Sequence, residues 1–541
     1  MKLNEISLHQ KSVWEEAGFE LPHYDRQLMI EKTKQSPHWI HFGAGNIFRA
    51  FPANLQQNLL NVQKIDTGLL VAEGYDYEII DKIYHPHDNL SVLVTLKSDG
   101  SIQKTVVGSI AESLKMDPSN AVEWKRLKEV FCNPSLQMVS FTITEKGYSL
   151  ANAEGIFIDA VKRDFYNGPA APISYMGKLT ALIYERYLAG NLPIALVSMD
   201  NCSHNGEKLF HAIDTFAKKW EESGNIKSGF LNYIHDPDKV SFPWSMIDKI
   251  TPRPDDSVKK MLQKSGFKDV KTEVTSRHSY VAPFVNSEEM QYLVIEDWFP
   301  NGRPPLEDTG VIFTDRVTVD KVEKMKVCTC LNPLHTALAI FGCLLNYTLI
   351  SKEMQDPDLK RLVEIIGYQE GLPAVTNQRI IGPKEFLDTA LKVRIPNPFM
   401  PDTPQRIATD TSQKLAVRYG ETIKAYLANP ALNISNLKII PLVLAGWCRY
   451  LMGIDDQGKL FQPSPDPLLS ENQKYLSKIH LGDQGPFHEK LQPIFSNQTI
   501  FGVDLYQAGL GDLAEHYFEE LVSGKGAVRK TLEKYTKLYI H

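Results

Sequence analysis

Four short apolar runs, each ending in a polar or glycine-containing turn, constrain this chain more than any other feature. The runs lie at residues 39–42, 68–72, 138–144 and 194–198. Such short and continuously apolar runs are typical of strands buried on both faces of a parallel sheet. Helix-like stretches at 52–61 and 175–188 separate them. This alternation of strands and helices predicts an α/β fold.

The second half of the chain has a different pattern. After about residue 305, periodic apolar segments dominate, at 333–350, 358–366, 385–393, 412–428, 438–452 and 505–537. This periodicity predicts a mostly α-helical domain. The chain has 541 residues, too many for one compact core. With the proline-rich segment 301–306 as the junction, we predict an α/β domain at 1–305 and a mostly helical domain at 306–541.

The charge and the sequence near the N-terminus exclude several classes of protein. The 59 basic and 65 acidic residues leave a net charge of −6, which argues against binding to nucleic acid or to anionic lipid. The first residues lack the apolar core of a signal peptide. The most apolar window, 336–350, is too short to span a bilayer. We therefore expect a cytoplasmic protein that contacts no membrane.

The cysteines predict no structural zinc site. The six residues contain no CxxC pair, although Cys328 and Cys330 lie two positions apart. We interpret these two as small residues of the core or near the site, with a redox or metal role as the alternative.

A glycine turn follows the first predicted strand. Gly43 and Gly45 flank Ala44 before a helix, and a turn without Cβ atoms lets backbone N–H groups approach a pyrophosphate. Glu73 ends the second strand, where an acid binds ribose hydroxyls and repels a 2′-phosphate. No arginine lies at 74–78, so the pair predicts a Rossmann-type domain that binds NAD. An ordinary tight turn and a solvated carboxylate are the alternatives.

Asn201 follows the fourth predicted strand, directly after Asp200. Ligand sites of open α/β sheets gather at the carboxyl ends of strands, and the Asn201 amide can donate to a developing alkoxide. For the nearby Asn205 and Gly206, turn and helix-cap chemistry is the simpler interpretation.

The segment 323–335 carries the strongest chemical signal. Pro333 suits the first position of a helix, which makes Asn332 the expected N-cap. The apolar residues that follow predict a buried helix, whose start presents Asn332 and His335 to an interior site. The positive end of the helix dipole favours a neutral His335 and lowers the pKa of a nearby lysine, as a general base requires. A capped helix with a satisfied core histidine is the alternative.

Two cations, Arg406 and Lys414, lie eight residues apart. On a helix this spacing is just over two turns, so both side chains can point the same way and grip a polyhydroxy or carboxylate substrate. Solvated surface cations are the commoner explanation of such a pair.

Together these segments resemble the mannitol dehydrogenase family, the polyol-specific long-chain dehydrogenases. The matching segments occur in the family's order along the chain, at 21–26, 43–50, 144–148, 200–206, 245–252, 294–297, 302–305, 326–335, 406–414 and 447–451. The resemblance implies a Rossmann-type N-terminal domain followed by a mostly helical domain, with NAD as cofactor and no metal.

The resemblance also implies a role for each candidate residue. Lys326 is the expected general base, and Asn201 and Asn332 the amides that stabilise the alkoxide. His335 is expected to orient the substrate. Arg406 and Lys414 are expected to bind the distal oxygens of the substrate. Glu145 and Glu323 are expected to form a proton path. The residues expected on the cofactor side of the site are Gly43, Gly45, Asn46, Glu73 and Asp248.

The sequence departs from the family pattern at the lysine. Lys326 lies six positions before Asn332, one more than the family spacing. A one-residue bulge accommodates the difference, and the alternative is a shifted lysine such as Lys324. The family's histidine–arginine pair after the glycine turn is replaced here by Phe48 and Arg49.

The function implied is reversible hydride transfer between NAD(H) and a C2 ketone or alcohol of a six-carbon sugar or sugar acid. The cations near the expected site, Lys392, Arg394, Arg406 and Lys414, favour the sugar acids fructuronate and mannonate. Mannitol/fructose and tagaturonate/altronate are the alternatives within the family. A non-catalytic NAD-binding sensor and a zinc-dependent alcohol dehydrogenase are alternatives of other classes. We expect a monomer whose only partner is the small-molecule substrate.

Overall fold

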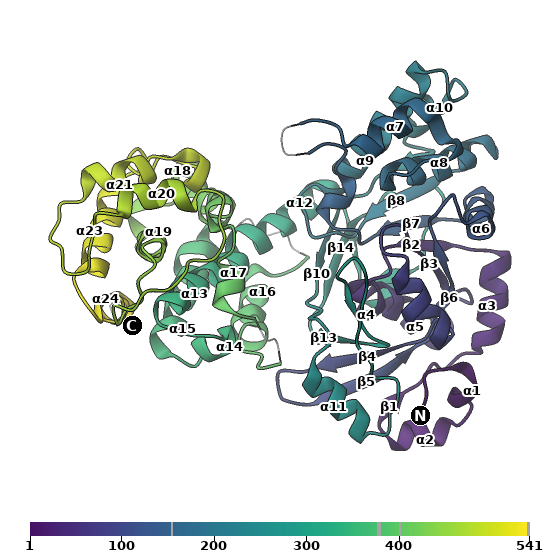
Figure 1. Ribbon diagram of the computed structural model, residues 1–541, viewed down its shortest axis with the longest axis horizontal. Helices are drawn as coiled ribbons and strands as arrows, with labels where there is room; N and C mark the ends of the chain where they lie inside the picture. Colours follow the sequence, from purple (N-terminus) through teal and green to yellow (C-terminus); the bar gives the residue numbers. More distant parts are fainter. Residues whose placement is uncertain (153–154, 376–379, 400–401, 538–541) are drawn as a thin grey trace. The chain divides into compact units, whose positions relative to one another are not determined.

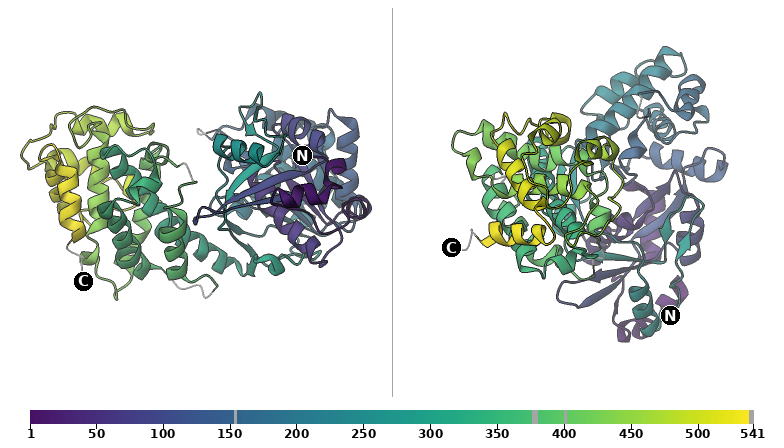
Figure 2. Two further views of the ribbon diagram at one scale, coloured as in Figure 1. Left: turned by 90° about the horizontal axis from the view of Figure 1, so that it is seen from below. Right: turned by 60° about the vertical axis from the view of Figure 1, so that its left-hand side comes forward.

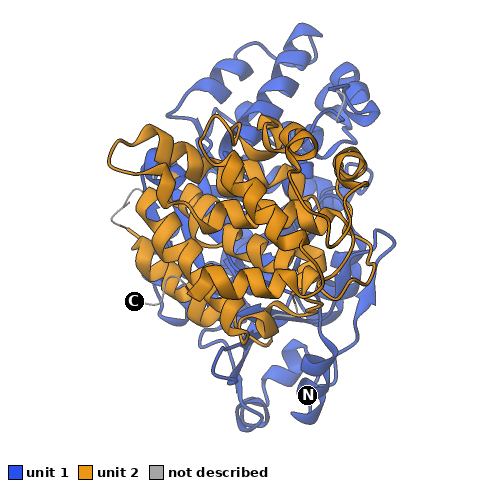
Figure 3. Ribbon diagram, turned by 90° about the vertical axis from the view of Figure 1, so that its left-hand side faces the viewer, with its two compact units in different colours: residues 1–320 blue, residues 321–541 orange. Residues whose placement is uncertain are grey.

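The computed structural model describes residues 1–152, 155–375, 380–399 and 402–537 (Figure 1). The chain forms two compact units, Met1–Asp320 and Lys321–His541 (Figure 3). The division falls within helix α12 (Arg316–Lys324), later than the boundary after residue 305 that the sequence suggested. Each unit is described by itself below.

A parallel six-stranded sheet forms the centre of the first unit. Its strand order is β6-β3-β2-β7-β8-β9, and every neighbouring pair is parallel. The strands are β2 (Trp39–Phe42), β3 (Leu69–Glu73), β6 (Ile110–Lys115), β7 (Met138–Phe141), β8 (Ile194–Ser198) and β9 (Val240–Ser241). The four predicted strands are β2, β3, β7 and β8, so the predicted α/β fold is confirmed. The strands β6 and β9 at the two edges were not predicted.

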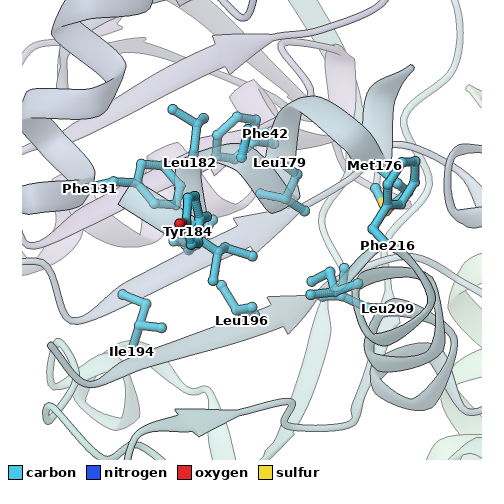
Figure 4. Packing of buried hydrophobic residues seen from close by; sticks show 14 of the residues in the cluster. Phe42, Phe131, Met176, Leu179, Leu182, Tyr184, Ile194, Leu196, Leu209 and Phe216 are labelled. Atoms are coloured by element: carbon cyan, nitrogen blue, oxygen red, sulfur yellow. The ribbon is translucent and has the colours of Figure 1, made fainter. Parts of the chain in front are cut away.

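Two hydrophobic clusters explain why the central strands are apolar at successive positions. Ile40 and Phe42 belong to one cluster, together with Leu196 and the helices α6 (Ala121–Cys132), α8 (Tyr175–Leu188) and α9 (Asn205–Glu222) (Figure 4). Trp39 and Val197 belong to the other cluster, with α5 (Pro52–Asn61). Alternate strand residues thus pack on opposite faces of the sheet. The observed bounds of α5 and α8 match the predicted helices.

Smaller sheets complete the first unit. A four-stranded sheet has the order β1-β5-β4-β13, a three-stranded sheet the order β10-β14-β15, and β11 pairs with β12. Their strands are β1 (Phe19–Glu20), β4 (Ser91–Leu96), β5 (Ile102–Val107), β10 (Ser245–Asp248), β11 (Glu273–Val274), β12 (Tyr280–Val281), β13 (Phe284–Glu288), β14 (Tyr292–Glu296) and β15 (Ile312–Thr314). The remaining longer helices of the unit are α2 (Lys11–Glu16), α3 (Arg26–Gln35), α7 (Asp159–Asn167), α10 (Phe230–His235) and α11 (Asp256–Lys264).

The second unit is helical, and its described residues contain no strand (Figure 2). Its longer helices are α13 (Asn332–Leu344), α15 (Pro357–Glu364), α16 (Pro383–Thr389), α18 (Glu421–Ala428), α19 (Ile439–Leu451), α20 (Leu469–Leu476), α21 (His488–Phe495), α23 (Gly511–Val522) and α24 (Ala527–Lys537). Every residue of α19 is buried. The prediction of a mostly α-helical second domain is therefore confirmed.

A π-helical turn, η6 (Met325–Cys330), lies between α12 and α13. The N–H of Leu331 donates to the carbonyl of Lys326 at 3.2 Å, a bond that spans five residues instead of four. Such a turn inserts one residue into a helix. The structure therefore contains the one-residue bulge that the spacing between Lys326 and Asn332 suggested.

The helical stretch Arg316–Leu344 has 29 residues and is long and apolar enough to cross a membrane, judged by length and composition alone. However, 83% of its apolar window is buried inside the protein. The interior position of α13 accounts for this composition, because a helix apolar on every side is typical of a protein core.

A buried carboxyl group lies beside α13. Glu353 ends the short helix α14 (Ile350–Glu353) and has no exposed surface. Neither of its carboxyl oxygens has a hydrogen-bond partner among the described residues. Burial raises its pKa from an ordinary 4.5 to about 9, and Asp356 contributes to the shift. Glu353 is therefore protonated at neutral pH in the folded protein.

Replacing Glu353 by glutamine should remove a pH dependence of stability. Between pH 4.5 and 9 the folded protein holds a proton that the unfolded chain has released, so the stability of the native chain falls as the pH rises. We expect Glu353→Gln to raise the free energy of unfolding by about 4 kcal/mol more at pH 8 than at pH 5. Thermal and urea unfolding at both pH values measure this difference.

Glu489→Gln, at an exposed position of α21, is the matched control and should change stability equally at both pH values. An equal effect of Glu353→Gln at pH 5 and pH 8 would show that Glu353 is ionised in the folded protein.

Candidate active site

The carboxyl ends of four neighbouring strands meet at one edge of the main sheet. The parallel pairing of β3 with β2, β2 with β7, and β7 with β8 aligns these ends. Gly43 follows β2, Glu73 ends β3, Glu145 follows β7, and Asn201 follows β8. Ligands of open α/β sheets bind at this edge, so the predicted residues of the first unit lie where such a site is expected.

The two glycines of the turn after β2 have different requirements. Gly43 has φ of +107°, and a Cβ there would lie 2.3 Å from the carbonyl oxygen of Thr142, so only glycine fits. A Cβ on Gly45 would meet nothing within 4 Å. The turn therefore needs Gly43 for its own geometry, while Gly45 borders open space into which a ligand can approach the backbone.

The helix after this turn begins earlier than expected. A short helix, α4 (Asn46–Ala50), starts directly after Gly45, and Pro52 opens the longer helix α5. Asn46 accepts a hydrogen bond from Arg49 at 2.8 Å, and Arg49 also donates to the Ala282 carbonyl at 2.6 Å. Arg49, which is fully buried, thus anchors the residues beside the turn.

Glu73 holds the glycine turn in place. Its carboxylate accepts hydrogen bonds from the backbone N–H groups of Ala44 at 2.9 Å, Tyr75 at 2.8 Å and Asp76 at 3.1 Å. Burial raises its pKa, and these three hydrogen bonds partly oppose the shift. The Glu73 carboxylate therefore binds backbone N–H groups in this structure. Its predicted contact with a ribose stays a prediction.

The cofactor side of the sheet also contains cations that the local sequence did not reveal. Arg277 lies over the ring of Tyr75 at 4.8 Å. Both line a cavity of about 550 Å³ together with Arg163 and Lys178. Although residues 74–78 contain no arginine, Arg277 thus contacts this segment from a position about 200 residues away in the sequence. No local pattern could have identified it.

Asp200 fixes the loop that carries Glu145. Its carboxylate accepts hydrogen bonds from the N–H groups of Ile143 at 2.9 Å and Thr144 at 2.8 Å, and from the Tyr148 hydroxyl at 2.5 Å. The backbone of Thr144 has φ of +65°, a strained value for a residue with a side chain. The two N–H bonds to Asp200 stabilise this conformation.

The residues around Asp200 differ in exposure. Asn201 is exposed, as a substrate contact requires. Asn205 is buried and donates to the carbonyls of Asp200 and Ser245, so it joins β8 to β10. Glu145 is 62% exposed and forms an ion pair with Lys208 at 2.6 Å. Its predicted place in a proton path stays a prediction.

Asp248 ends β10 and is buried. The first residue of the same strand, Ser245, donates from its hydroxyl to the carbonyl of Ser198 at 2.5 Å. This bond ties the start of β10 to the last residue of β8, so β10 begins near the same edge of the main sheet. The predicted contact of Asp248 with the cofactor stays a prediction.

In the second unit, burial distinguishes the two candidate lysines. Lys326, in the π-turn, is only 3% exposed, whereas Lys324 is exposed. Glu323 precedes Lys326 by three positions and is partly buried, so both lie on neighbouring parts of one helical surface. The buried Lys326 therefore fits the requirements of an interior acid–base group better than the exposed Lys324 does.

The predicted cap at Asn332 is wrong by one position. Leu331 is the N-cap of α13, and Asn332 is its first helical residue. The π-turn keeps the chain helical up to Cys330, so the break is confined to Leu331, with φ of −133° and ψ of −61°. The Asn332 side chain does not cap this helix, so its amide can bind another group.

His335 is neutral at physiological pH. Although part of its surface remains accessible, desolvation by the surrounding protein lowers its pKa to about 4. Asp402 opposes the shift, and the guanidinium groups of Arg394, Arg418 and Arg406 add to it. The neutral state agrees with the sequence-based expectation, and its largest cause is burial.

Arg406 and Lys414 do not share a continuous helix, contrary to the interpretation of their spacing. Helix α17 (Pro404–Ile407) ends early, and Asp410 adopts a left-handed conformation with φ of +54° before a 3-10 turn. Arg406 is 72% exposed and forms a bidentate pair with Asp402 at 2.6–2.7 Å. Lys414 donates to the carbonyls of Ile407 and Thr409, and burial lowers its pKa.

Two further arginines complete the cations of this region. Arg394 is 4% exposed. Arg418, which the sequence analysis did not identify, donates to the hydroxyl of Thr336 at 2.5 Å. Lys392, by contrast, is 68% exposed and pairs with Asp388 at 2.9 Å. No local spacing pattern points to Arg418, because it contacts α13 from a distant segment of the chain.

Among the described residues, no group of three or more His, Cys, Asp or Glu side chains is arranged to hold a metal ion. All six cysteines are free thiols, and burial raises the pKa of Cys330 to about 12. The metal independence of the reaction stays a prediction.

Comparisons with known proteins cover both units. The model of the mannitol dehydrogenase Rossmann domain matches residues 37–308, and that of the mannitol dehydrogenase C-terminal domain matches 318–521. D-mannonate oxidoreductase of Thermotoga maritima is 53% identical over 536 residues, 99% of each chain. Mannitol 2-dehydrogenase of Cereibacter sphaeroides is 28% identical, over 82% of this chain and 86% of that protein.

A solved structure is also similar over the whole chain. Mannitol 2-dehydrogenase of Pseudomonas fluorescens, in a ternary complex with NAD and D-mannitol, has a TM-score of 0.71 and 25% sequence identity. The match covers 99% of this chain and 100% of that one.

Substitution of the two glycines by alanine should separate folding from cofactor binding. Gly43→Ala should destabilise the first unit by about 3 kcal/mol, because both the positive φ and the Thr142 carbonyl oppose a Cβ. Gly45→Ala should change stability by less than about 0.5 kcal/mol but weaken NADH binding at least about tenfold, because its Cβ enters the space beside the backbone.

Thermal unfolding and fluorescence titration with NADH measure both effects. Unchanged NADH affinity in Gly45→Ala would remove the turn from the cofactor site.

Proposed function

Since the chain belongs to the mannitol dehydrogenase family, we propose that it is an NAD-dependent oxidoreductase that interconverts D-fructuronate and D-mannonate. The observation that carries this substrate assignment is the 53% identity with a D-mannonate oxidoreductase over 99% of both chains. In the reductive direction the ketone carbon gains a hydride and the ketone oxygen gains a proton. Oxidation of the secondary alcohol reverses both transfers.

The turn after β2 fits a dinucleotide. Gly45 borders open space, and the carboxylate of Glu73 fixes the neighbouring N–H of Ala44 at 2.9 Å. Gly43, Gly45 and Asn46 would hold the pyrophosphate at this turn. NADH bound there supplies the hydride, and NAD⁺ accepts it in the opposite direction.

Lys326 is the proposed acid–base group. Its Nζ donates a proton to the ketone oxygen during reduction and accepts the hydroxyl proton during oxidation. Burial of the side chain keeps this transfer away from bulk water. Glu323, three residues earlier on the helix, is the proposed relay to solvent, with Glu145 of the first unit as its other member.

The amides of Asn201 and Asn332 are proposed to donate to the reacting oxygen, which carries negative charge as the hydride leaves or arrives. His335, neutral because of its burial, can donate one hydrogen bond and accept another, which suits the orientation of a substrate rich in hydroxyl groups. Arg406 and Lys414 are proposed to bind the distal oxygens.

Mannitol 2-dehydrogenase activity is the second candidate, favoured by the similar structure of a mannitol 2-dehydrogenase with NAD and D-mannitol. An assay of NADH oxidation with fructuronate, tagaturonate and fructose distinguishes the candidates. Fructuronate should have the highest kcat/KM. A preference for fructose or tagaturonate would overturn the assignment, and no NADH oxidation with any of the three would favour a non-catalytic NAD-binding protein.

We further propose that the enzyme acts in the cytoplasm as a monomer. The six free thiols support a reducing compartment. Size-exclusion chromatography with light scattering tests the oligomeric state.

The two lysines of this helix provide a matched test of the acid–base role. Lys326→Ala should lower kcat by about 10³-fold, because no other group would supply the proton, while the NADH dissociation constant stays within about threefold of the native value. Lys324→Ala removes an equal charge two residues away and should leave kcat within about threefold. Added methylamine should restore part of the activity of Lys326→Ala. Near-normal turnover of Lys326→Ala would exclude the assigned role.

A further inference from the structure

Arg418 is hydrogen-bonded near the start of α13, at Thr336, the residue after His335. It lies in the π-helical turn η11 (Ala416–Gly420), and its Nη1 donates to the Thr336 hydroxyl at 2.5 Å. Thr336 in turn donates to the carbonyl of Asn332 at 3.0 Å. The following residue, Tyr419, donates from its hydroxyl to the Pro333 carbonyl at 2.6 Å. These bonds position the Arg418 guanidinium against the helix start that carries Asn332 and His335.

The charge of Arg418 is not neutralised by any acidic side chain of the described residues. Within the described part of the chain, its one hydrogen bond is to a neutral hydroxyl. Burial lowers its pKa to about 10, and no carboxylate opposes this shift. The group is therefore still a cation at neutral pH, held in a partly desolvated position without a counter-ion. Such a position is costly for a charge unless an anion joins it.

Two other arginines of this protein form more hydrogen bonds than Arg418 does. Arg186 is fully buried and donates to five backbone carbonyls. Arg406 forms its bidentate pair with Asp402. A guanidinium has five N–H donors, and Arg418 uses Nη1 alone. Its Nε and Nη2 form no hydrogen bond to a described residue, and the residue is partly exposed, so a ligand can reach these donors.

The surroundings of His335 carry an excess of positive charge. Three guanidinium groups, those of Arg394, Arg418 and Arg406, lower the pKa of His335, and one carboxylate, Asp402, raises it. His335 itself is neutral. This region of the second unit therefore favours an anion over a neutral ligand.

We propose that Arg418 binds the carboxylate of the sugar-acid substrate and thereby selects sugar acids over neutral sugars. This inference rests on the proposed oxidoreductase function. A planar guanidinium with free Nε and Nη2 donors matches a carboxylate bidentately. A neutral hexose or polyol offers no charge in that place. Lys414 and Arg406 are less suited to this role, because both are already engaged by carbonyl or carboxylate oxygens.

The test compares Arg418→Gln with the native enzyme in reactions with NADH. The KM for fructuronate and the inhibition constant for mannonate should each rise about 100-fold. The inhibition constant for mannitol and the kcat for fructuronate should stay within about threefold, because the reacting groups are unchanged. Arg418→Lys keeps the charge but not the bidentate geometry, so its KM should rise about tenfold.

Two further variants separate a binding role from a structural one. Thr336→Val removes the hydrogen bond to Arg418 but leaves the charge of Arg418 in place. The KM for fructuronate should therefore rise no more than about threefold. Lys424→Gln removes an exposed cation of α18 that pairs with Glu421 and should leave every constant unchanged. Thermal unfolding and NADH titration show whether each variant is folded. If Arg418→Gln does not fold, Arg418→Lys and Thr336→Val carry the test.

Three outcomes would overturn the proposal. Unchanged constants for fructuronate and mannonate in folded Arg418→Gln would exclude the contact. Equal losses for mannonate and mannitol, or a loss of kcat with unchanged KM, would indicate a structural role. If the native enzyme oxidises NADH with none of the keto acids, the proposed function and this inference both fail. Native activity with fructuronate that is unaffected in Arg418→Gln overturns the inference alone.

Discussion

Two buried carboxylates, Glu73 and Asp200, hold the edge of the main sheet on which the first unit's site depends. Each ends or follows a strand and accepts backbone N–H groups from the loop after the neighbouring strand. Glu73 at the end of β3 binds the N–H of Ala44 after β2, and Asp200 after β8 binds those of Ile143 and Thr144 after β7. Burial raises the pKa of both groups, while these hydrogen bonds favour their charged forms. The loops are thus shaped before any ligand binds, which lowers the entropy cost of binding.

Sequence reasoning identified the elements whose burial leaves a local signal. The strands β2 and β8 are apolar because both sheet faces are covered, and the bounds of α5 and α8 follow from their periodicity. The edge strand β6 and the antiparallel pair β4 and β5 were missed. Strands β5 and β6 are partly exposed, whereas β4 is mostly buried. The pairing of β13 with β4 joins segments about 190 residues apart, and no local pattern encodes such a partner.

In the candidate site, too, features with a local sequence signal were predicted and features that depend on remote contacts were not. A buried helix after Asn332 and a neutral His335 followed from the apolar residues at 336–350. The cap at Asn332 was misplaced because the π-turn extends the preceding helix, and the helix through Arg406 and Lys414 was wrong because Asp410 interrupts it. Arg277 and Arg418 were missed because each acts through a contact with a remote part of the chain, Tyr75 for one and Thr336 for the other. Side chains whose contacts lie far away in the sequence are therefore the least visible in it.

The π-turn at Met325–Cys330 has a consequence for how the two ends of the long helix are related. One additional residue rotates everything on one side of it by about 100° relative to the other side, while the helix axis continues. A gain or loss of one residue within this turn can therefore be absorbed without refolding either end. The direction of the buried Lys326 side chain relative to α13 therefore depends on this one turn.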